Sequence, residues 1–222
     1  MQAYIEFLKT HGPRFIDGTI VTLEQAALGA LLAIIVALIA AFMKMSSIFP
    51  VRWLGIAYIE LFRGTSLLVQ MYWIFFVLPL FGFTLDRFTA GFIAVGLNLG
   101  AYGAELVRGG VQAVPVQQYE ACKALNIPAF TRMRRVIFPQ ALLIMLPPWG
   151  NLLIELLKGT ALVALISVTD LMFEAKQINS TTFLSAQAFG TALVIYYIIA
   201  RGLLTPAIRW LEKILSRKLS IG

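Results

Sequence analysis

Five long stretches of this 222-residue chain contain no Asp, Glu, Lys or Arg, and they restrict the fold more than any other feature. Each approaches or exceeds the ~20 residues that a helix needs to cross the hydrocarbon core of a bilayer. With 59% hydrophobic residues and a mean hydropathy of +0.84, the chain is too apolar for a water-soluble domain. The sequence therefore predicts an all-α membrane protein with five transmembrane helices. The uncharged stretches are residues 25–43, 64–85, 88–104, 136–154 and 177–200.

The positions of the cations predict which side of the membrane each connection occupies. If the connections after the first and third spans share one side with the C-terminus, that side holds twelve Lys or Arg, among them Lys44, Arg52 and Arg63. The opposite side then holds four. Because connections rich in Lys and Arg stay in the cytoplasm, we expect the N-terminus outside and the C-terminus in the cytoplasm.

This topology divides the chain into three segments. Residues 1–18 lack the charged start and apolar centre of a signal peptide, so we expect a short external segment there. Residues 19–212 are expected to form the transmembrane domain, with a cytoplasmic loop at about 114–139. Residues 213–222 would then form a cytoplasmic tail.

Residue size predicts how the spans are arranged. The first span, about residues 19–43, has no ionisable group after Glu24 and is expected to face lipid, and the second is expected to run over about residues 53–80. The third span, about residues 89–111, is expected in the interior or at a dimer contact, because small residues let helices approach closely within a membrane. Those small residues are Gly91, Gly96, Gly100, Ala101, Gly103 and Ala104.

The later spans differ in character. The fourth begins after Pro139 and carries Pro147 and Pro148, which remove backbone donors and are expected to bend or break the helix. The fifth, about residues 186–204, is followed by a basic amphipathic segment suited to the membrane interface.

Cysteine, histidine and charge composition argue against several classes of site. A single cysteine, Cys122, rules out an internal disulfide, and the single histidine, His11, has no neighbours suited to a metal site. We therefore expect no catalytic residue and no metal. The cations outnumber the acids, 18 to 11, but they lie at span ends, so we expect no nucleic-acid binding.

Three acid–base pairs with i, i+3 spacing occur in or near the spans: Glu60 with Arg63, Glu105 with Arg108, and Glu155 with Lys158. Each pair shares a helix face and could neutralise itself. We favour that structural reading for Glu105 and Arg108. For Glu155 and Lys158 we favour a functional role, because ionisable groups at membrane depth usually face a bundle interior or a wet cavity.

An internal repeat links two of these pairs. Residues 59–67 recur as residues 154–162, with six of nine positions identical and the cation kept. In the deduced topology both spans run from inside to outside, so a parallel repeat is possible.

Polar residues within and beyond these spans could form a path for a small polar solute. A zwitterion such as an amino acid needs a cation for its carboxylate and an anion for its ammonium, and both are present. The residues that we expect to line this path are Glu60, Arg63, Thr65, Gln70, Glu155, Lys158, Thr160 and Asp170.

The long polar segment before the fourth span has the pattern of a helix, a turn and a second helix. Residues 120–125 favour a short helix, Asn126 can take the left-handed conformation that ends one, and Pro128 prevents its continuation. A second helix carrying Arg132, Arg134 and Arg135 would end at Pro139. We expect this unit on the cytoplasmic face.

At these residues the chain resembles the permease subunits of bacterial ATP-binding-cassette importers, in the polar amino acid uptake group. That group's loop reads Glu-Ala-Ala, three residues, Gly, nine residues, Ile-x-Leu-Pro. Here Cys122 replaces an Ala and Asn126 replaces the Gly, while residues 136–139 read Val-Ile-Phe-Pro. Residues 62–70, 102–109 and 158–170 resemble further signature segments, so the resemblance extends from residue 19 to about residue 212.

The resemblance implies a type I importer permease fold in the bacterial cytoplasmic (inner) membrane, surrounded by lipid. It implies three partners: a second permease subunit, a cytoplasmic ATPase dimer that binds ATP and Mg²⁺, and an external or periplasmic solute-binding protein. The chain lacks a phosphate-binding loop motif, so we expect it to bind no cofactor and to hydrolyse no ATP itself. The residues that would couple it to the ATPase are Glu120, Ala121, Cys122, Asn126, Arg132, Arg135 and Pro139.

One alternative is a secondary transporter or channel that works alone and is coupled to ions through the acids of the spans. The large basic loop argues against it, because a self-sufficient carrier does not need one. A membrane enzyme is disfavoured by the lack of a nucleophile and base pair. Neither the solute nor the choice between homodimer and heterodimer follows from the sequence.

Overall fold

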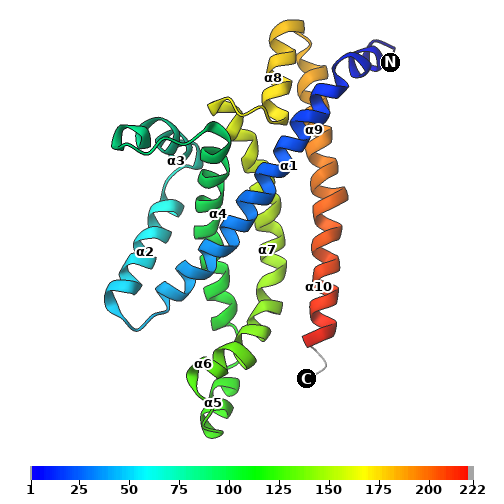
Figure 1. Cartoon of the computed structure of the whole chain (residues 1–222). Coiled ribbons are helices and arrows are strands. Elements are labelled where there is room, and N and C mark those ends of the chain that lie inside the picture. The colour runs from blue at the N-terminus through cyan, green and yellow to red at the C-terminus, as the bar shows by residue number, and fades with distance from the viewer. Residues whose placement is uncertain (1, 220–222) are drawn as a thin grey trace.

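The computed structural model describes residues 2–219, and within that range it is helical, with short connections and no strand (Figure 1). Elements η1, η3 and η5 are π-helical and η2 and η4 are 3₁₀-helical. The elements are α1 (Gln2–Lys44), α2 (Phe49–Gly64), α3 (Leu67–Tyr72), η1 (Trp73–Val77), η2 (Leu78–Phe81), α4 (Arg87–Gln112), α5 (Val116–Ala124), α6 (Ala129–Arg132), η3 (Met133–Ile137), α7 (Phe138–Thr160), η4 (Ala161–Ile166), α8 (Leu171–Thr182), α9 (Ser185–Ile198), η5 (Ile199–Leu204) and α10 (Thr205–Leu219).

The described residues contain four helical runs that are long and apolar enough to cross a membrane. A fifth candidate span is the bent pair Phe49–Gly64 and Leu67–Phe81, whose two parts meet at 107°. Counted this way, the predicted five spans are confirmed. The four unbroken runs are Tyr4–Lys44, Arg87–Gln112, Ala129–Ile166 and Ser185–Arg217.

The second span, predicted over about residues 53–80 with a break only at Pro79 and Gly82, has a further break that was not predicted. Thr65 and Ser66 take extended backbone conformations, so α2 ends at Gly64 and α3 starts in a new direction. Thr65 Oγ1 donates to the carbonyl of Leu61 at 2.7 Å, which satisfies one acceptor at the exposed end of α2. A break at membrane depth is tolerated where the chain can satisfy its own backbone groups.

Helix α4 lies in the centre of the bundle, as predicted, and packs against α1, α2 and α7. The glycines of α4 allow these neighbouring helices to approach closely. A Cβ atom on Gly103 would lie 2.7 Å from the Trp149 ring of α7, and one on Gly96 would lie 2.8 Å from the Leu32 side chain of α1. Close packing replaces the hydrophobic effect as the attraction between helices in a bilayer.

Helix α1 crosses the bundle at a slant and is longer than predicted (Figure 1). Residues 2–18, expected as a separate external segment, continue this helix towards the N-terminus. One side of α1 buries Ala33, Ala37 and Ala41 against the bundle, and the other side leaves Leu31 and Ile39 more than half exposed. The expected lipid-facing surface is therefore only one side of this helix.

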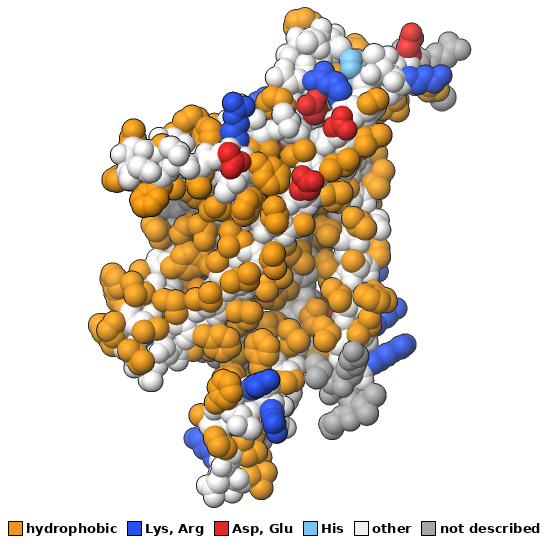
Figure 2. Space-filling model, viewed as in Figure 1, with side chains coloured by type: hydrophobic (Ala, Val, Ile, Leu, Met, Phe, Trp, Pro, Cys, Tyr) orange, Lys and Arg blue, Asp and Glu red, His pale blue; other side chains and the backbone are white. Residues whose placement is uncertain are grey.

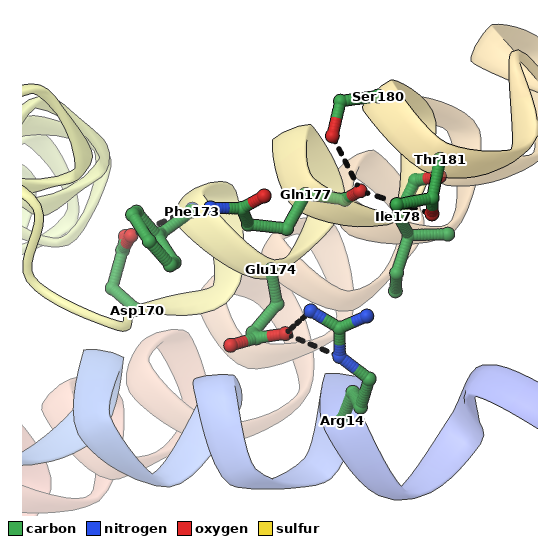
Figure 3. Close-up of polar contacts among 8 residues, drawn as sticks. All are labelled: Arg14, Asp170, Phe173, Glu174, Gln177, Ile178, Ser180 and Thr181. Carbon is green, nitrogen blue, oxygen red and sulfur yellow. Dashed lines mark hydrogen bonds and ion pairs between the residues drawn. The ribbon is translucent and has the colours of Figure 1, made fainter.

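An ion pair, drawn in Figure 3, and one backbone hydrogen bond join α1 to α8 at the end of the molecule near the N-terminus. Arg14 lies 2.7 Å from the Glu174 carboxylate, and the Leu171 N–H donates to Thr22 Oγ1 at 3.0 Å. Asp170 is fully buried and accepts from the Phe173 N–H at 2.9 Å, which caps α8. Burial raises the pKa of Asp170 to about 6.

Charged side chains gather towards the two ends of the face shown in Figure 2, and apolar side chains cover the middle. This distribution suits a bilayer, whose core excludes charge. At the other end of the molecule from α8, α5 and α6 project beyond the remaining helices (Figure 1).

Substituting Gly103 by Ala should destabilise the protein by about 1–3 kcal/mol, because the added methyl group overlaps the Trp149 ring. Gly109 is the matched control on the same helix, since nothing lies within 4 Å of a Cβ atom there. Gly109→Ala should leave stability unchanged or raise it slightly. Thermal unfolding of the purified protein in detergent measures both. Equal unfolding temperatures for the two variants would contradict the packing described for α4.

Candidate functional site

The first candidate site is the projecting lobe of residues 113–137, which contains α5, α6 and η3 (Figure 1). Helix α5 ends as predicted. Asn126 has a φ of 52°, the Ile127 N–H donates to the Cys122 carbonyl at 2.9 Å, and the Asn126 N–H donates to the Lys123 carbonyl at 3.0 Å. These two bonds form a Schellman motif, which fixes the angle between α5 and α6.

The lobe is fastened to both central helices. Val114, Cys122 and Ile137 are buried at its base, and Tyr119 donates its hydroxyl proton to the Val111 carbonyl at the end of α4, at 2.9 Å. Burial raises the pKa of Tyr119, which keeps the hydroxyl protonated as this bond requires.

Helix α6 does not end at Pro139 as predicted. It continues through η3 into α7, so that residues Ala129–Ile166 form one helical run. A π-helical turn before Pro139 shifts the hydrogen-bond register, and Pro139 lies in the first turn of α7. Pro147 and Pro148 do not break α7 either. Helix α6, η3 and α7 are consequently one continuous helical run.

The outer surface of the lobe combines charges with apolar side chains. Glu120, Ala121 and Arg135 are exposed, and Arg132 is partly exposed. Within residues 2–219, Glu120 and the lobe cations form no ion pair. Leu125 and Phe130 are 73% and 75% exposed. Neither apolar side chain was predicted from the sequence as part of the site, although both flank the Asn126 and Pro128 turn.

The second candidate site comprises the polar residues that we expected along a solute path, which the structure divides among three places. Thr65 and Gln70 lie at the break between α2 and α3. Gln70 donates to the Phe62 carbonyl at 2.9 Å and accepts from Asn98 of α4 at 2.9 Å. A largely apolar cavity of about 510 Å³ lies beside them. Asn98 was not singled out from the sequence.

Glu60 and Arg63 are not paired with each other in the described part of the chain. The Arg63 guanidinium lies 5.4 Å from the centre of the Tyr102 ring, within range of a cation–π contact. Arg63 also lies at the opposite end of α2 from Arg52, although the sequence predicted both on the side of Lys44. The remaining cation asymmetry still favours the predicted topology.

The predicted pair of Glu105 and Arg108 is confirmed at 2.7 Å, and Lys44 joins it at 2.6 Å. Lys44 is the last residue of α1, so the cluster fastens that end of α1 to α4. This supports a structural role for the pair.

Glu155 and Lys158 lie exposed on α7, and the described residues give neither an ionic partner. Thr160 and Asp170 are fully buried. Thr160 donates to the Leu157 carbonyl at 2.7 Å, and Asp170 caps α8, so their polar atoms are engaged within the protein. Of these four residues, Glu155 and Lys158 are therefore the ones available to a solute.

A polar groove between α7 and α10 was missed altogether from the sequence. It has a volume of about 250 Å³, and we name it the α7–α10 groove. Its signal in the sequence is Arg201, the cation that ends the last uncharged stretch. Residues 2–219 contain no group of three His, Cys, Asp or Glu placed to hold a metal ion. The groove is lined by Pro147, Gly150, Asn151, Ile154, Arg201, Thr205, Ile208, Arg209 and Glu212.

Comparison with known proteins gives consistent matches. Residues 29–221 match the family described as binding-protein-dependent transport system inner membrane component. A protein of Sinorhizobium fredii named as a probable amino-acid ABC transporter permease is 47% identical over 156 residues, which are 68% of this chain and 66% of that protein. The L-cystine transport system permease protein of Bacillus subtilis is 38% identical over 76% of this chain and 72% of its own length.

The fold is also found among solved structures. A chain in the crystal structure of an amino acid ABC transporter with histidines superposes with a TM-score of 0.87. It is 37% identical, and the match covers 95% of this chain and 97% of that chain.

The left-handed turn of the lobe predicts contrasting effects of two substitutions. Asn126→Gly should leave the lobe intact, because glycine adopts a φ of 52° at no steric cost. Asn126→Val should loosen it, because a β-branched residue is strained in this region by about 1–2 kcal/mol. Limited trypsin digestion at Lys123 and Arg132 measures the difference, with faster cleavage expected only for the valine variant. Equal cleavage of the two variants would show that the turn is not held in this conformation.

Proposed function

This chain belongs to the family of inner membrane components of binding-protein-dependent transport systems, and from that premise we propose that it is the permease subunit of an ATP-driven amino acid importer. The observation that carries the proposal is the continuity of the lobe with the central helices. A projecting lobe on the end of α4 and α7 gives an external motor a surface to hold and a rigid route to the membrane interior.

We propose that the solute is an amino acid or a related small zwitterion. The two relatives described above are named for the transport of amino acids and of L-cystine. All amino acids share a carboxylate and an ammonium group. Glu155 and Lys158 of α7 are exposed, have no ionic partner among residues 2–219, and offer one complementary charge for each.

The importer we propose contains three further components. A second permease, identical or related, would complete the path, and a solute-binding protein outside the membrane would deliver the solute. Two ATPase subunits would bind ATP and Mg²⁺ in the cytoplasm. The membrane would be the bacterial cytoplasmic membrane, with the N-terminus outside and the lobe and the C-terminus inside. The excess of cations at the lobe end supports this orientation.

The mechanism follows from the rigidity of the connections. When the ATPases close on ATP, they move the lobe, whose exposed Glu120, Leu125 and Phe130 form the contact surface. The Schellman turn and the Tyr119 hydrogen bond prevent the lobe from bending under this load. The motion then passes along η3 into α7 and turns the solute-facing side of α7 alternately towards each side of the membrane.

Reversal of one charge on the lobe tests the proposal. Glu120→Lys should abolish solute-stimulated ATP hydrolysis and uptake by the reconstituted complex, because it places a cation where the ATPase surface would meet an acid. Insertion and stability should not change, since Glu120 makes no ion pair within residues 2–219.

Glu6→Lys is the matched control, because Glu6 is also exposed and lies near the other end of the molecule. It should leave ATP hydrolysis and uptake at the level of the native protein. Full stimulation in the Glu120→Lys variant would contradict the proposed contact surface. Uptake without any ATPase subunit would instead support an ion-coupled secondary transporter or channel.

A further inference from the structure

Arg201 is a charge in an unexpected position. It lies in the π-helical turn η5, within the helical run Ser185–Arg217. It is exposed, and within residues 2–219 it has no ionic or hydrogen-bonding partner. Arg201 directly follows the uncharged stretch 177–200, so it lies near one end of the predicted span 186–204, where a long cationic side chain can reach the interface or a wet groove. Single π-turns within helices also occur often at functional sites.

The groove beside Arg201 has a clear packing origin. Ile208 of α10 packs directly on Gly150 of α7, where an added Cβ atom would lie only 2.6 Å from the Ile208 side chain. This contact draws the two helices together and forms the floor of the α7–α10 groove. Arg201 and Arg209 line it from one side, and Asn151 of α7 lines it from the other.

The polar surface extends from the groove along α7. Asn151, Glu155 and Lys158 are spaced i, i+4 and i+7, so they lie on one face of the helix, and all three are exposed. In the described part of the chain their side chains make no hydrogen bond or ion pair with each other or with α10. A stripe with three unsatisfied polar groups is unsuited to a lipid-facing surface.

The charges of this surface do not balance. Two cations, Arg201 and Arg209, line the groove together with one acid, Glu212. Arg201 also presents a planar fork of donors, which matches the two oxygens of a carboxylate. The surface is therefore suited to a solute with more carboxylates than ammonium groups.

We propose that the α7–α10 groove binds a carboxylate of the transported solute through Arg201, and that the excess of cations selects acidic amino acids over basic ones. This inference rests on the proposed function, because it requires that the chain transport amino acids. To the proposed function it adds a binding residue, Arg201, a binding place, the α7–α10 groove, and a class of solute, the acidic amino acids.

The test compares uptake of L-glutamate and L-arginine by the complete importer in proteoliposomes. The native complex should transport L-glutamate in preference to L-arginine. Arg201→Gln should lower L-glutamate uptake at least about tenfold, since a hydrogen bond to a charged group is lost. Arg201→Lys should retain part of it. Stimulation of ATP hydrolysis by the loaded binding protein should persist in Arg201→Gln, because the lobe is unchanged.

Lys213→Gln serves as the control for lipid binding. Lys213 lies on the same helix and borders a second hollow together with Arg201 and Trp210, but it does not line the α7–α10 groove. It should transport L-glutamate at the native rate. If the two variants lose uptake equally, and both recover when the anionic lipid content of the vesicles is raised, then Arg201 binds lipid and the inference is overturned.

A second measurement leaves Arg201 unchanged, so its result does not depend on whether the Arg201 variants fold. Asn151→Cys, in a Cys122→Ala background of the complete importer, puts a thiol in the groove. L-glutamate should slow its reaction with a water-soluble thiosulfonate, and L-arginine should not. Leu203→Cys is the control, because Leu203 is exposed but does not line the groove.

The outcomes separate the two proposals. If the native complex moves no amino acid with ATP, the proposed function fails. If the complex moves amino acids but Arg201→Gln behaves as native, or if L-arginine is preferred, only the carboxylate site is overturned. Absence of protection of Asn151→Cys by L-glutamate would also overturn it.

Discussion

The close approach of α4 to its neighbours is the constraint on which the rest of the structure depends. In a bilayer the hydrophobic effect does not drive helices together, so the bundle is held by packing over small residues. Gly96 and Gly103 bring α4 against α1 and α7 at distances that a Cβ atom would not permit. The Lys44, Glu105 and Arg108 cluster fastens the end of α1 to α4, and Arg14 with Glu174 fastens α1 to α8.

Because α4 and α7 are closely packed, a force on the lobe is transmitted to the centre of the bundle. The lobe begins where α4 ends and leads into α7 without a break in the helix, so both of its attachments belong to the centre of the bundle. A displacement of the lobe cannot be absorbed by a loose linker. It must move α7, and α7 carries Asn151, Glu155 and Lys158 on its exposed face. Helix α6 of the lobe and the surface that would meet the solute therefore lie on one helical run, and the Asn126 turn joins α5 to it.

Features with a local cause could be predicted from the sequence. Uncharged stretches located the spans, glycine content placed the third span inside, and the preference of Asn for left-handed backbone located the turn at Asn126. Features that depend on tertiary contacts could not be predicted from the sequence. The break at Thr65 and Ser66 is compatible with the structure because Gln70 and Asn98 satisfy the Phe62 carbonyl.

The candidate site shows the same limit. The i, i+3 spacing permits an ion pair but does not require one, so Glu105 is paired and Glu155 is not. Likewise Asp170 and Thr160 were expected beside a solute, and the structure buries them in capping and backbone contacts. Arg201 could not be identified as a site residue from the sequence. The groove that it lines is formed by the contact between Gly150 and Ile208, which are distant in sequence.

The claim on which the account depends most is that the lobe lies in the cytoplasm. Cys122 is buried and cannot report its side, but Leu125 is 73% exposed at the tip of the lobe. A Leu125→Cys variant in a Cys122→Ala background can be labelled with a membrane-impermeant maleimide in sealed vesicles of known orientation. The account predicts labelling in inside-out vesicles and none in right-side-out vesicles. Ready labelling in intact right-side-out vesicles would contradict it.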